Sequence, residues 1–597
     1  MKDEQADLVK WWSRYQSGIS YNQALIIGEK SYYDTIDVNI AFSNDDQWRN
    51  VEAEDISKPT IPILQKAKQY SVANVTSTAI SATIQPEEFN SNEEERNPEM
   101  QGEIEATEMA NAEIRNIFDR TKFEFKVREG LGDAFDMGDM CLHTLWNAEV
   151  KPLKGKKFEQ FQGQIDAELV DGPNIMFGNG NNADPQIQPY IIVVGRELAT
   201  TLQDEAKTYK ETTQINEDTE WEYQAGDNGK IEVEADKYGK ALYIIVYEKD
   251  KKTGKVKASK LVQNSFIYKD IDTELTRYPI AWFNYKKQKN QYHGRAGATG
   301  LISNQIAINK LLAMIIYSVM KTAFPTMVYN GERMSAPTNE IGKAIPLRNM
   351  TPGENVNNVA GFLQTGQVAQ QTFSLIEMII THTKDMLGIT DAAVGNVNPD
   401  NTSAMALAEK LTSVPLENVR SNLYEFTEQF VDNLLDMMGA KYGTRPVKIT
   451  DGDNTSIQIF DFSKMKELNV SKRIDVGSIG YASELSSLKD LRDLLELGAI
   501  TVVEYLERLP EHQIPEVKEL IEQIKKREGL ISADQQEENN VKFEEMVAFI
   551  ETLPPEVQEQ LRALPDDQLE IEVERLMAEG GGNNQQAQGD LNQLIGG

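Results

Sequence analysis

The chain of 597 residues has a single cysteine, Cys141, and too few basic side chains to balance its acidic ones. One cysteine excludes an intrachain disulfide, which fits a reducing compartment. The 61 lysine and arginine residues against 94 aspartate and glutamate residues leave a formal net charge of −33. A sequence-specific DNA-binding protein carries a basic face, so the composition argues against that class. Two interpretations remain: an ordinary acidic protein, or a surface past which a polyanion moves without adhering.

Targeting and membrane segments are also lacking. Met1–Asp7 is charged and polar with no apolar run behind it, so we expect no signal peptide. The best membrane candidate, Ile306–Met320, is interrupted by Asn309 and Lys310. Its uncharged remainder, Leu311–Met320, is shorter than the ~20 residues that a bilayer span needs. We therefore expect a cytoplasmic protein with no membrane partner.

The signatures of nucleotide and metal enzymes are missing as well. No Gly-Lys pair is followed by the Ser or Thr of a P-loop, which argues against a motor ATPase. The histidines show no paired metal-ligand spacing; they are His143, His293, His382 and His512. We therefore predict no cofactor and no metal site.

Three local patterns each allow a chemical reading and a structural one. Cys141 and His143 would share a face of a strand, as a catalytic dyad or as a buried thiol beside a histidine. Gly294–Gly300 precedes a helix and is either an anion cradle or a flexible helix entry. Asp451–Thr455 resembles the start of a calcium loop, but Phe462 stands where a glutamate is required. The structural reading is favoured in all three, so we expect no enzyme.

What the chain does contain is enough apolar sequence for real cores. Apolar residues make up 40% and aromatic residues 8%, and the length exceeds what one core usually serves, so we expect several domains. Helical patterns occur at Val9–Tyr15, Ile61–Val75, Glu103–Phe125, Glu129–Gly138 and Leu198–Thr208, with an exposed loop at Gln85–Gly102. Strand patterns occur at Asp139–Val150, Gln164–Val170, Tyr190–Val194, Ile231–Ala235, Ala241–Glu248, Lys255–Leu261 and Tyr278–Tyr285. Turn residues between them favour antiparallel hairpins and an α+β fold.

A pair of helices with an insert between them follows. Thr299–Thr322 has an apolar stripe from Leu301 to Val319 and would reach roughly 36 Å, with Pro325 at its end. The insert contains short strand patterns at Thr326–Tyr329 and Ala344–Leu347. The second helix is Thr372–Gly388.

The second helix leads into Ile389–Thr402, a loop of small, turn-forming residues, and then into a long helix, Ser403–Met438. Pro415 predicts a kink in that helix. A hairpin is expected from Pro446–Thr450 and Ser456–Phe460, followed by a strand near Arg473–Gly477. Helices are expected over Leu485–Arg527 and Val541–Met577. Residues 580–597 are rich in Gly, Asn and Gln and are expected to be disordered.

Several loose motifs occur in an order that is more specific than any one of them. They are Gly132–Met140, Val170–Pro173, His293–Gly297 ahead of Gln305 and Asn309, Met386–Thr390, Asn401–Ala406, Leu494–Thr501 and Tyr505–Leu506. With these, the chain from about Glu129 to Arg527 resembles the portal proteins of tailed bacteriophages. Such proteins form a ring, usually of twelve subunits, at one capsid vertex, through which DNA is pumped in and later ejected.

The resemblance implies a multidomain, helix-rich α+β subunit with wing, stem, clip and crown. Its parts would be 1–298, the N-terminal wing; 299–322, a stem helix; 323–371, the clip; 372–388, the second stem helix; 389–402, the tunnel loop; 403–484, the kinked wing helix and hairpin; 485–579, the crown and C-terminal extension; and 580–597, the tail. Residues beyond Leu530 extend past the family's pattern.

The function implied is a non-enzymatic conduit for double-stranded DNA in the virion, assembled in the cytoplasm of a bacterial host. The partners implied are terminase, the neck or adaptor proteins, and the major capsid and scaffolding proteins. The expected channel residues, in the tunnel loop, are Asp391, Asn396, Asn398, Asp400, Asn401 and Thr402. The residues singled out on the stem are Gln305, Asn309, Lys310, Lys321 and Lys384. An acidic channel wall would hold few phosphates, and the stem lysines are either intersubunit or phosphate contacts or ordinary solvated side chains. The alternative is another capsid or connector protein without a DNA channel.

Overall fold

The computed structural model describes residues 2–28, 30–52, 56–77, 80–86, 98–148, 150, 162–211, 213–218, 239–338, 340, 342–363, 370–386, 414–451, 454–467, 470–475, 491–492, 495, 501–507 and 524. The chain divides into two compact units, Met1–Ser483 and Glu484–Gly597. The described helix of the second unit is α12 (Val502–Glu507), inside the predicted helical span Leu485–Arg527. Everything else below belongs to the first unit, which is mixed α+β as predicted.

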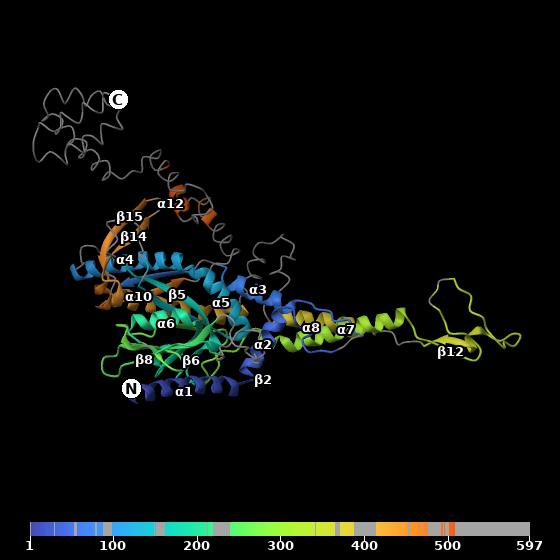
Figure 1. The fold of residues 1–597 in the computed structure, drawn as a ribbon. Coiled ribbons are helices and arrows are strands. Elements are labelled where there is room, and N and C mark those ends of the chain that lie inside the picture. The colour runs from blue at the N-terminus through green and yellow to red at the C-terminus, as the bar shows by residue number, and fades with distance from the viewer. Residues whose placement is uncertain are drawn as a thin grey trace, which may run out of the picture. The chain divides into compact units, whose positions relative to one another are not determined.

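Helices open the first unit (Figure 1). They are α1 (Lys2–Ala24), α2 (Tyr32–Ser43), α3 (Ile63–Val75), α4 (Pro98–Thr121) and α5 (Phe123–Met137), with the short pair β1 (Ile26–Ile27) and β2 (Lys30–Ser31) between the first two. The Ser31 side chain caps α2 by accepting a hydrogen bond from the Asp34 amide, which supplies one of the acceptors that a helix start lacks.

Several of the predicted N-terminal boundaries were wrong. Val9–Tyr15 is only the middle of α1. The single helix expected at Glu103–Phe125 is interrupted at Lys122, whose φ of 52° is left-handed and separates α4 from α5. Of the predicted loop Gln85–Gly102, the first residues pair in a strand and the last five belong to α4, while residues 87–97 lie outside the described part.

The strands form antiparallel sheets, as the hairpin signals indicated. One sheet has the order β10-β9-β8-β7-β6, built from β6 (Ile175–Phe177), β7 (Ile191–Leu198), β8 (Lys240–Lys249), β9 (Val256–Leu261) and β10 (Phe266–Asp272). A second has the order β11-β4-β5, built from β4 (Asp139–Asn147), β5 (Gln164–Asp171) and β11 (Ile280–Asn284). The helix α6 (Ala199–Thr208) follows β7 where a helix was predicted. The predicted strand Ile231–Ala235 lies outside the described residues.

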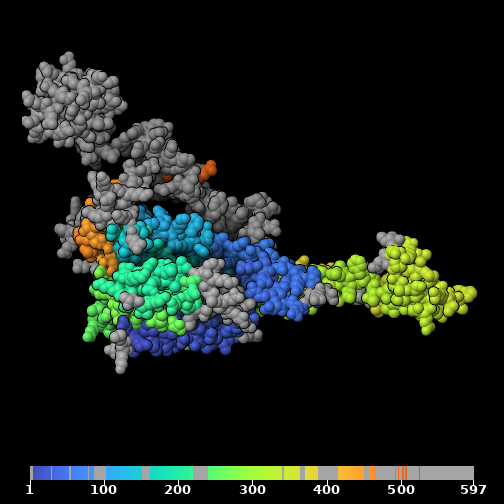
Figure 2. All heavy atoms as spheres, in the orientation of Figure 1, coloured from blue at the N-terminus to red at the C-terminus, as the bar shows by residue number. Residues whose placement is uncertain are grey.

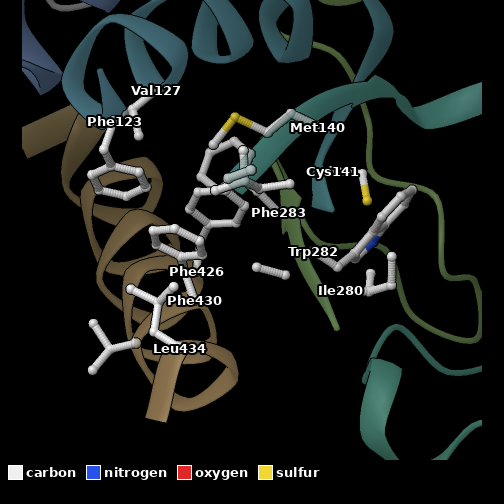
Figure 3. Packing of buried hydrophobic residues seen from close by; sticks show 14 of the residues in the cluster. Phe123, Val127, Met140, Cys141, Ile280, Trp282, Phe283, Phe426, Phe430 and Leu434 are labelled. Atoms are coloured by element: carbon white, nitrogen blue, oxygen red, sulfur yellow. The ribbon is translucent and has the colours of Figure 1, made fainter. Parts of the chain in front are cut away.

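The largest core lies between the second sheet and two helices (Figure 3). Phe123 from α5 stacks on Phe430 from α10 (Glu417–Lys441), with ring centroids 4.9 Å apart. Phe426, one turn earlier on α10, meets Phe283 of β11 edge-on at 6.0 Å. These side chains are almost fully buried, so each contributes about 1.5–3 kcal/mol by leaving water. The helix α10 is therefore the element on which the sheet and α5 are packed.

A buried ionic network ties the N-terminal helices to the sheet. Asp139 and His293 are both inaccessible to solvent, and His293 Nδ1 lies 2.6 Å from an Asp139 carboxylate oxygen. The other ring nitrogen lies 3.0 Å from the side-chain oxygen of Asn22 on α1. Both ring nitrogens of His293 are therefore within hydrogen-bond distance of a side-chain oxygen. Asp139 also accepts hydrogen bonds from Asn284 and from the backbone amide of Gly294.

The later elements are α7 (Ile302–Ala323), β12 (Met327–Tyr329), β13 (Ala360–Phe362), α8 (Gln370–Asp385), α10, β14 (Thr444–Asp451), β15 (Asn454–Asp461) and β16 (Val470–Asp475). The hairpin β14–β15 is where it was predicted, and β16 pairs with β3 (Ser81–Pro86). Ala344–Leu347 is not a strand; only an isolated bridge joins Leu347 to Met334. Pro415 lies in a 3-10 turn before α10, and the predicted helical residues 403–413 lie outside the described part.

Candidate assembly surface on the helix pair α7 and α8

The helices α7 and α8 pack against each other along one face. Ile308 and Ile315 of α7 and Ile376 of α8 form a small buried cluster, since their 3–4 and 7 spacing puts them on facing stripes. Below this cluster the Asn304 side-chain amide donates to the Thr383 hydroxyl at 3.0 Å. Thr383 in turn donates to the Ile379 carbonyl in its own helix. The pair is therefore fixed in register at its base.

The base of α7 is held by the N-terminal helical region. The Gln305 amide donates to the Ile61 carbonyl at 2.9 Å and to the Asn309 side-chain oxygen at 3.0 Å. The Asn309 amide donates to the Gln47 side-chain oxygen at 2.5 Å. Gln305 and Asn309 were predicted as stem residues, and both side chains are buried. Their role in this chain is to anchor the helix.

The distal half of α7 and the outer side of α8 expose large apolar side chains. On α7, Met314 is 65% exposed and Met320 48%, and Phe324 just after the helix is 81% exposed. The other exposed apolar residues of the pair are Tyr317, Val319, Phe373, Leu375, Met378 and Met386. A helix that is apolar all round is normally buried, and a contiguous exposed apolar surface marks a binding surface. We call this set of residues the assembly surface.

The apolar stripe on α7, from Leu301 to Val319, is not covered to the same extent along its length. The structure divides it: its lower part is buried in this chain, whereas Val319 near its upper end is 56% exposed. Figure 2 shows the yellow-green side chains of this part of α7 and of the following hairpin exposed on the face in view. On α7, the assembly surface is thus the distal part of the helix.

The hairpin β12–β13 that joins the two helices is also incompletely covered. Val328, Tyr329 and Phe362 on its strands are exposed. Arg333 and Glu354 form a 2.7 Å ion pair within this segment, and Glu354 also accepts hydrogen bonds from Thr351. Those hydrogen bonds, with Arg333, lower the pKa of the Glu354 carboxyl. The segment is therefore held by its own ion pair and hydrogen bonds, while the apolar side chains on its strands are exposed to solvent.

The predicted stem lysines occupy different environments. Lys310 and Lys321 are exposed on α7, and Lys384 is half-buried on α8. The Lys321 ammonium lies 5.5 Å from the centre of the Tyr317 ring, within cation–π range. The predicted tunnel-loop residues Asp391, Asn396, Asn398, Asp400, Asn401 and Thr402 all lie outside the described residues.

A membrane would be another way to cover α7, which by length and composition alone qualifies as a membrane span. Its lower part, however, hydrogen-bonds to the protein through Gln305 and Asn309. The free part from Leu311 to Ala323 is about 20 Å long at ~1.5 Å per residue, short of a ~30 Å hydrocarbon core. The geometry therefore favours protein over lipid as the cover.

The structure also places the other sequence candidates for chemistry that fall on described residues. Cys141 is fully buried, and burial raises the pKa of its thiol far above the ordinary value. Burial also lowers the pKa of His143 to about 4, and its Nε2 lies 2.7 Å from the Tyr247 hydroxyl. The Gly294 amide, a possible anion donor, is already bonded to Asp139. Among the described residues, no group of acidic, histidine and cysteine side chains fits a metal ion.

Neither a scan against known protein-family profiles nor a search of curated protein sequences finds a match to this chain.

Proposed function

We propose that this protein is a ring-forming structural subunit whose copies associate through the assembly surface. The observation that carries the proposal is that α7 is anchored by buried hydrogen bonds at its base and exposes apolar side chains along its distal half. Exposed apolar area costs free energy of about 25 cal/mol per Å², which association removes. In the proposed ring, α7 of one copy contacts α8 of the next in a head-to-tail arrangement, which forms a closed ring when the rotation between copies closes.

We further propose that this ring is a bacteriophage portal. The order of parts supports this: a helix, a hairpin-containing insert, a second helix and then the long helix α10 occur in the sequence positions expected for stem, clip, stem and wing. The net charge of −33 supports it too, because a strongly acidic wall binds few DNA phosphates. In this role the subunit passes double-stranded DNA, docks terminase and then the neck proteins, and sits in the virion at a capsid vertex.

Electron microscopy of the purified full chain tests the proposal. Open rings are expected, with a central hole wide enough for duplex DNA. Met320→Glu, which puts a charge on the assembly surface, should shift the protein toward monomers. Val9→Glu is the matched control, since Val9 is 61% exposed on α1, outside that surface. Rings closed by a packed centre would instead support a connector without a DNA channel, and wild-type monomers would refute both.

The tunnel loop has its own test in a packaging assay. Deletion of residues 398–402 is expected to leave rings intact and to block DNA packaging or retention. Loss of ring assembly in this deletion would show that the loop is a structural element, not a channel element.

A further inference from the structure

We propose that each copy inserts Met386, at the end of α8, into an apolar groove at the base of α7 of the neighbouring copy. The inference rests on the proposed ring and names the contact that closes it. The groove has a volume of about 370 Å³. It is lined by α2, by α7 and by the segment 46–51 that follows α2. Its apolar walls are Val38, Ala41, Phe42, Trp48, Val51 and Ile306.

The groove has an unused hydrogen-bond donor. The side-chain amide nitrogen of Gln47 is buried at the groove and has no partner among the described residues, although Gln47 is only 7% exposed. Its oxygen already accepts from Asn309, which fixes the nitrogen as the free end. A buried unpaired donor costs about 1–3 kcal/mol, so the occupant should bring an acceptor as well as an apolar side chain.

The C-terminal turn of α8 provides both. Met386 is 60% exposed, and its flexible thioether side chain suits an irregular apolar groove. The exposed carboxylate of Asp385, next to Met386, is the acceptor. Lys310 also lines the groove; it is exposed and has no ion pair with any described residue. Its ammonium complements the charge of the Asp385 carboxylate.

The two surfaces lie at the same level and on opposite sides of α7. Met386 is level with Asn304, because the Asn304 amide is 3.9 Å from the Met386 sulfur. Ile306 is two residues further, which is about 200° around the helix and ~3 Å along it. Rotation about a ring axis preserves height along that axis. When α7 and α8 run parallel to the ring axis, Met386 of one copy therefore lies at the same height as the groove of the next copy and reaches it.

Disulfide trapping tests the contact in the full-length protein, where the native Cys141 is buried and silent. Val51 lies on the groove and is 43% exposed, so it accepts a cysteine without loss of core packing. On mild oxidation, Val51→Cys with Met386→Cys in one chain should give a covalent ladder. A mixture of the two single variants should stop at dimers, and neither variant alone should cross-link.

The matched control pairs Met386→Cys with Ile187→Cys, which is 58% exposed and does not line the groove, and should give no ladder. Rings seen by microscopy in the Val51→Cys, Met386→Cys variant without cross-links would overturn this contact and leave the ring proposal standing. Cross-links from Met386→Cys alone would also overturn it, since they require a two-fold contact. Absence of rings in the wild type would refute the ring proposal itself.

A second measurement does not depend on cysteines. Met386→Glu should raise the concentration at which rings dissociate by about tenfold or more, because the charge cannot enter an apolar groove. The melting temperature of the dissociated subunit should not change, since Met386 is exposed in one copy. Rings of unchanged stability in this variant would contradict the inference.

Discussion

Removal of the buried charge at Asp139 should be among the most destabilising single substitutions in the chain. The carboxylate accepts 2.6 Å hydrogen bonds from Asn284, from the Gly294 amide and from His293 Nδ1, at a site with no solvent exposure. Asp139→Asn keeps the shape but replaces a carboxylate oxygen, which accepts hydrogen bonds, with an amide nitrogen, which donates, so at least one of these buried hydrogen bonds is lost. A buried donor left without its acceptor costs about 1–3 kcal/mol, a large fraction of the ~5–15 kcal/mol that stabilises a typical domain.

Urea unfolding followed by tryptophan fluorescence measures this cost, with wild type and variant at one protein concentration because assembly contributes to stability. Asp46→Asn is the matched control: Asp46 pairs with Arg49 at 2.6 Å on the surface, and exposed pairs contribute about 0–1 kcal/mol. A loss below about 1 kcal/mol in Asp139→Asn would refute the assignment of Asp139 as the shared acceptor of these buried hydrogen bonds.

Four further outcomes are expected. Burial raises the pKa of Asp133 to about 6. The folded carboxyl therefore keeps its proton to higher pH than the unfolded one, and the free energy of unfolding should fall as pH rises from about 4 to 6. Asp133→Asn should remove this fall and add about 1–2 kcal/mol to the free energy of unfolding at pH 7.5, measured by urea unfolding. Phe430→Ala should cost about 3–5 kcal/mol, against about 0.5 kcal/mol for the exposed Phe125→Ala, by the same assay. Gly138→Ala should cost several kcal/mol, because φ is +102° and the new Cβ would lie 2.4 Å from a backbone carbonyl oxygen. Cys141 should react with a thiol reagent only on unfolding, and rapid native labelling would contradict its buried position.

The elements that could be predicted from sequence are those with a strong local period or turn signal. The apolar stripe and Pro325 after it predicted both ends of α7 to within a few residues. The alternating residues around Asp451 gave the β14–β15 hairpin. By contrast, α2 was missed because most of its residues are buried, so it has no polar face to set a 3.6-residue period. The short strand β6 was missed because its three residues are defined by pairing with β7.

The base of the candidate site depends on long-range partners that a single sequence does not reveal. The sequence placed Gln305 and Asn309 on the predicted stem helix but did not show what they contact. Their partners, Ile61 and Gln47, lie 244 and 262 positions away. The available signal was the pair of amides four residues apart within an apolar helix, which is typical of a buried hydrogen-bonded pair. The groove beside them combines α2 with α7 and could be found only once the fold was known.

The most direct test of the ring is the particle mass of the purified full chain in dilute buffer, together with its image by electron microscopy. The account predicts a closed annulus of many 67.2 kDa subunits with an open centre, converted to smaller species by Met320→Glu. A monomeric wild-type protein at micromolar concentration would contradict it.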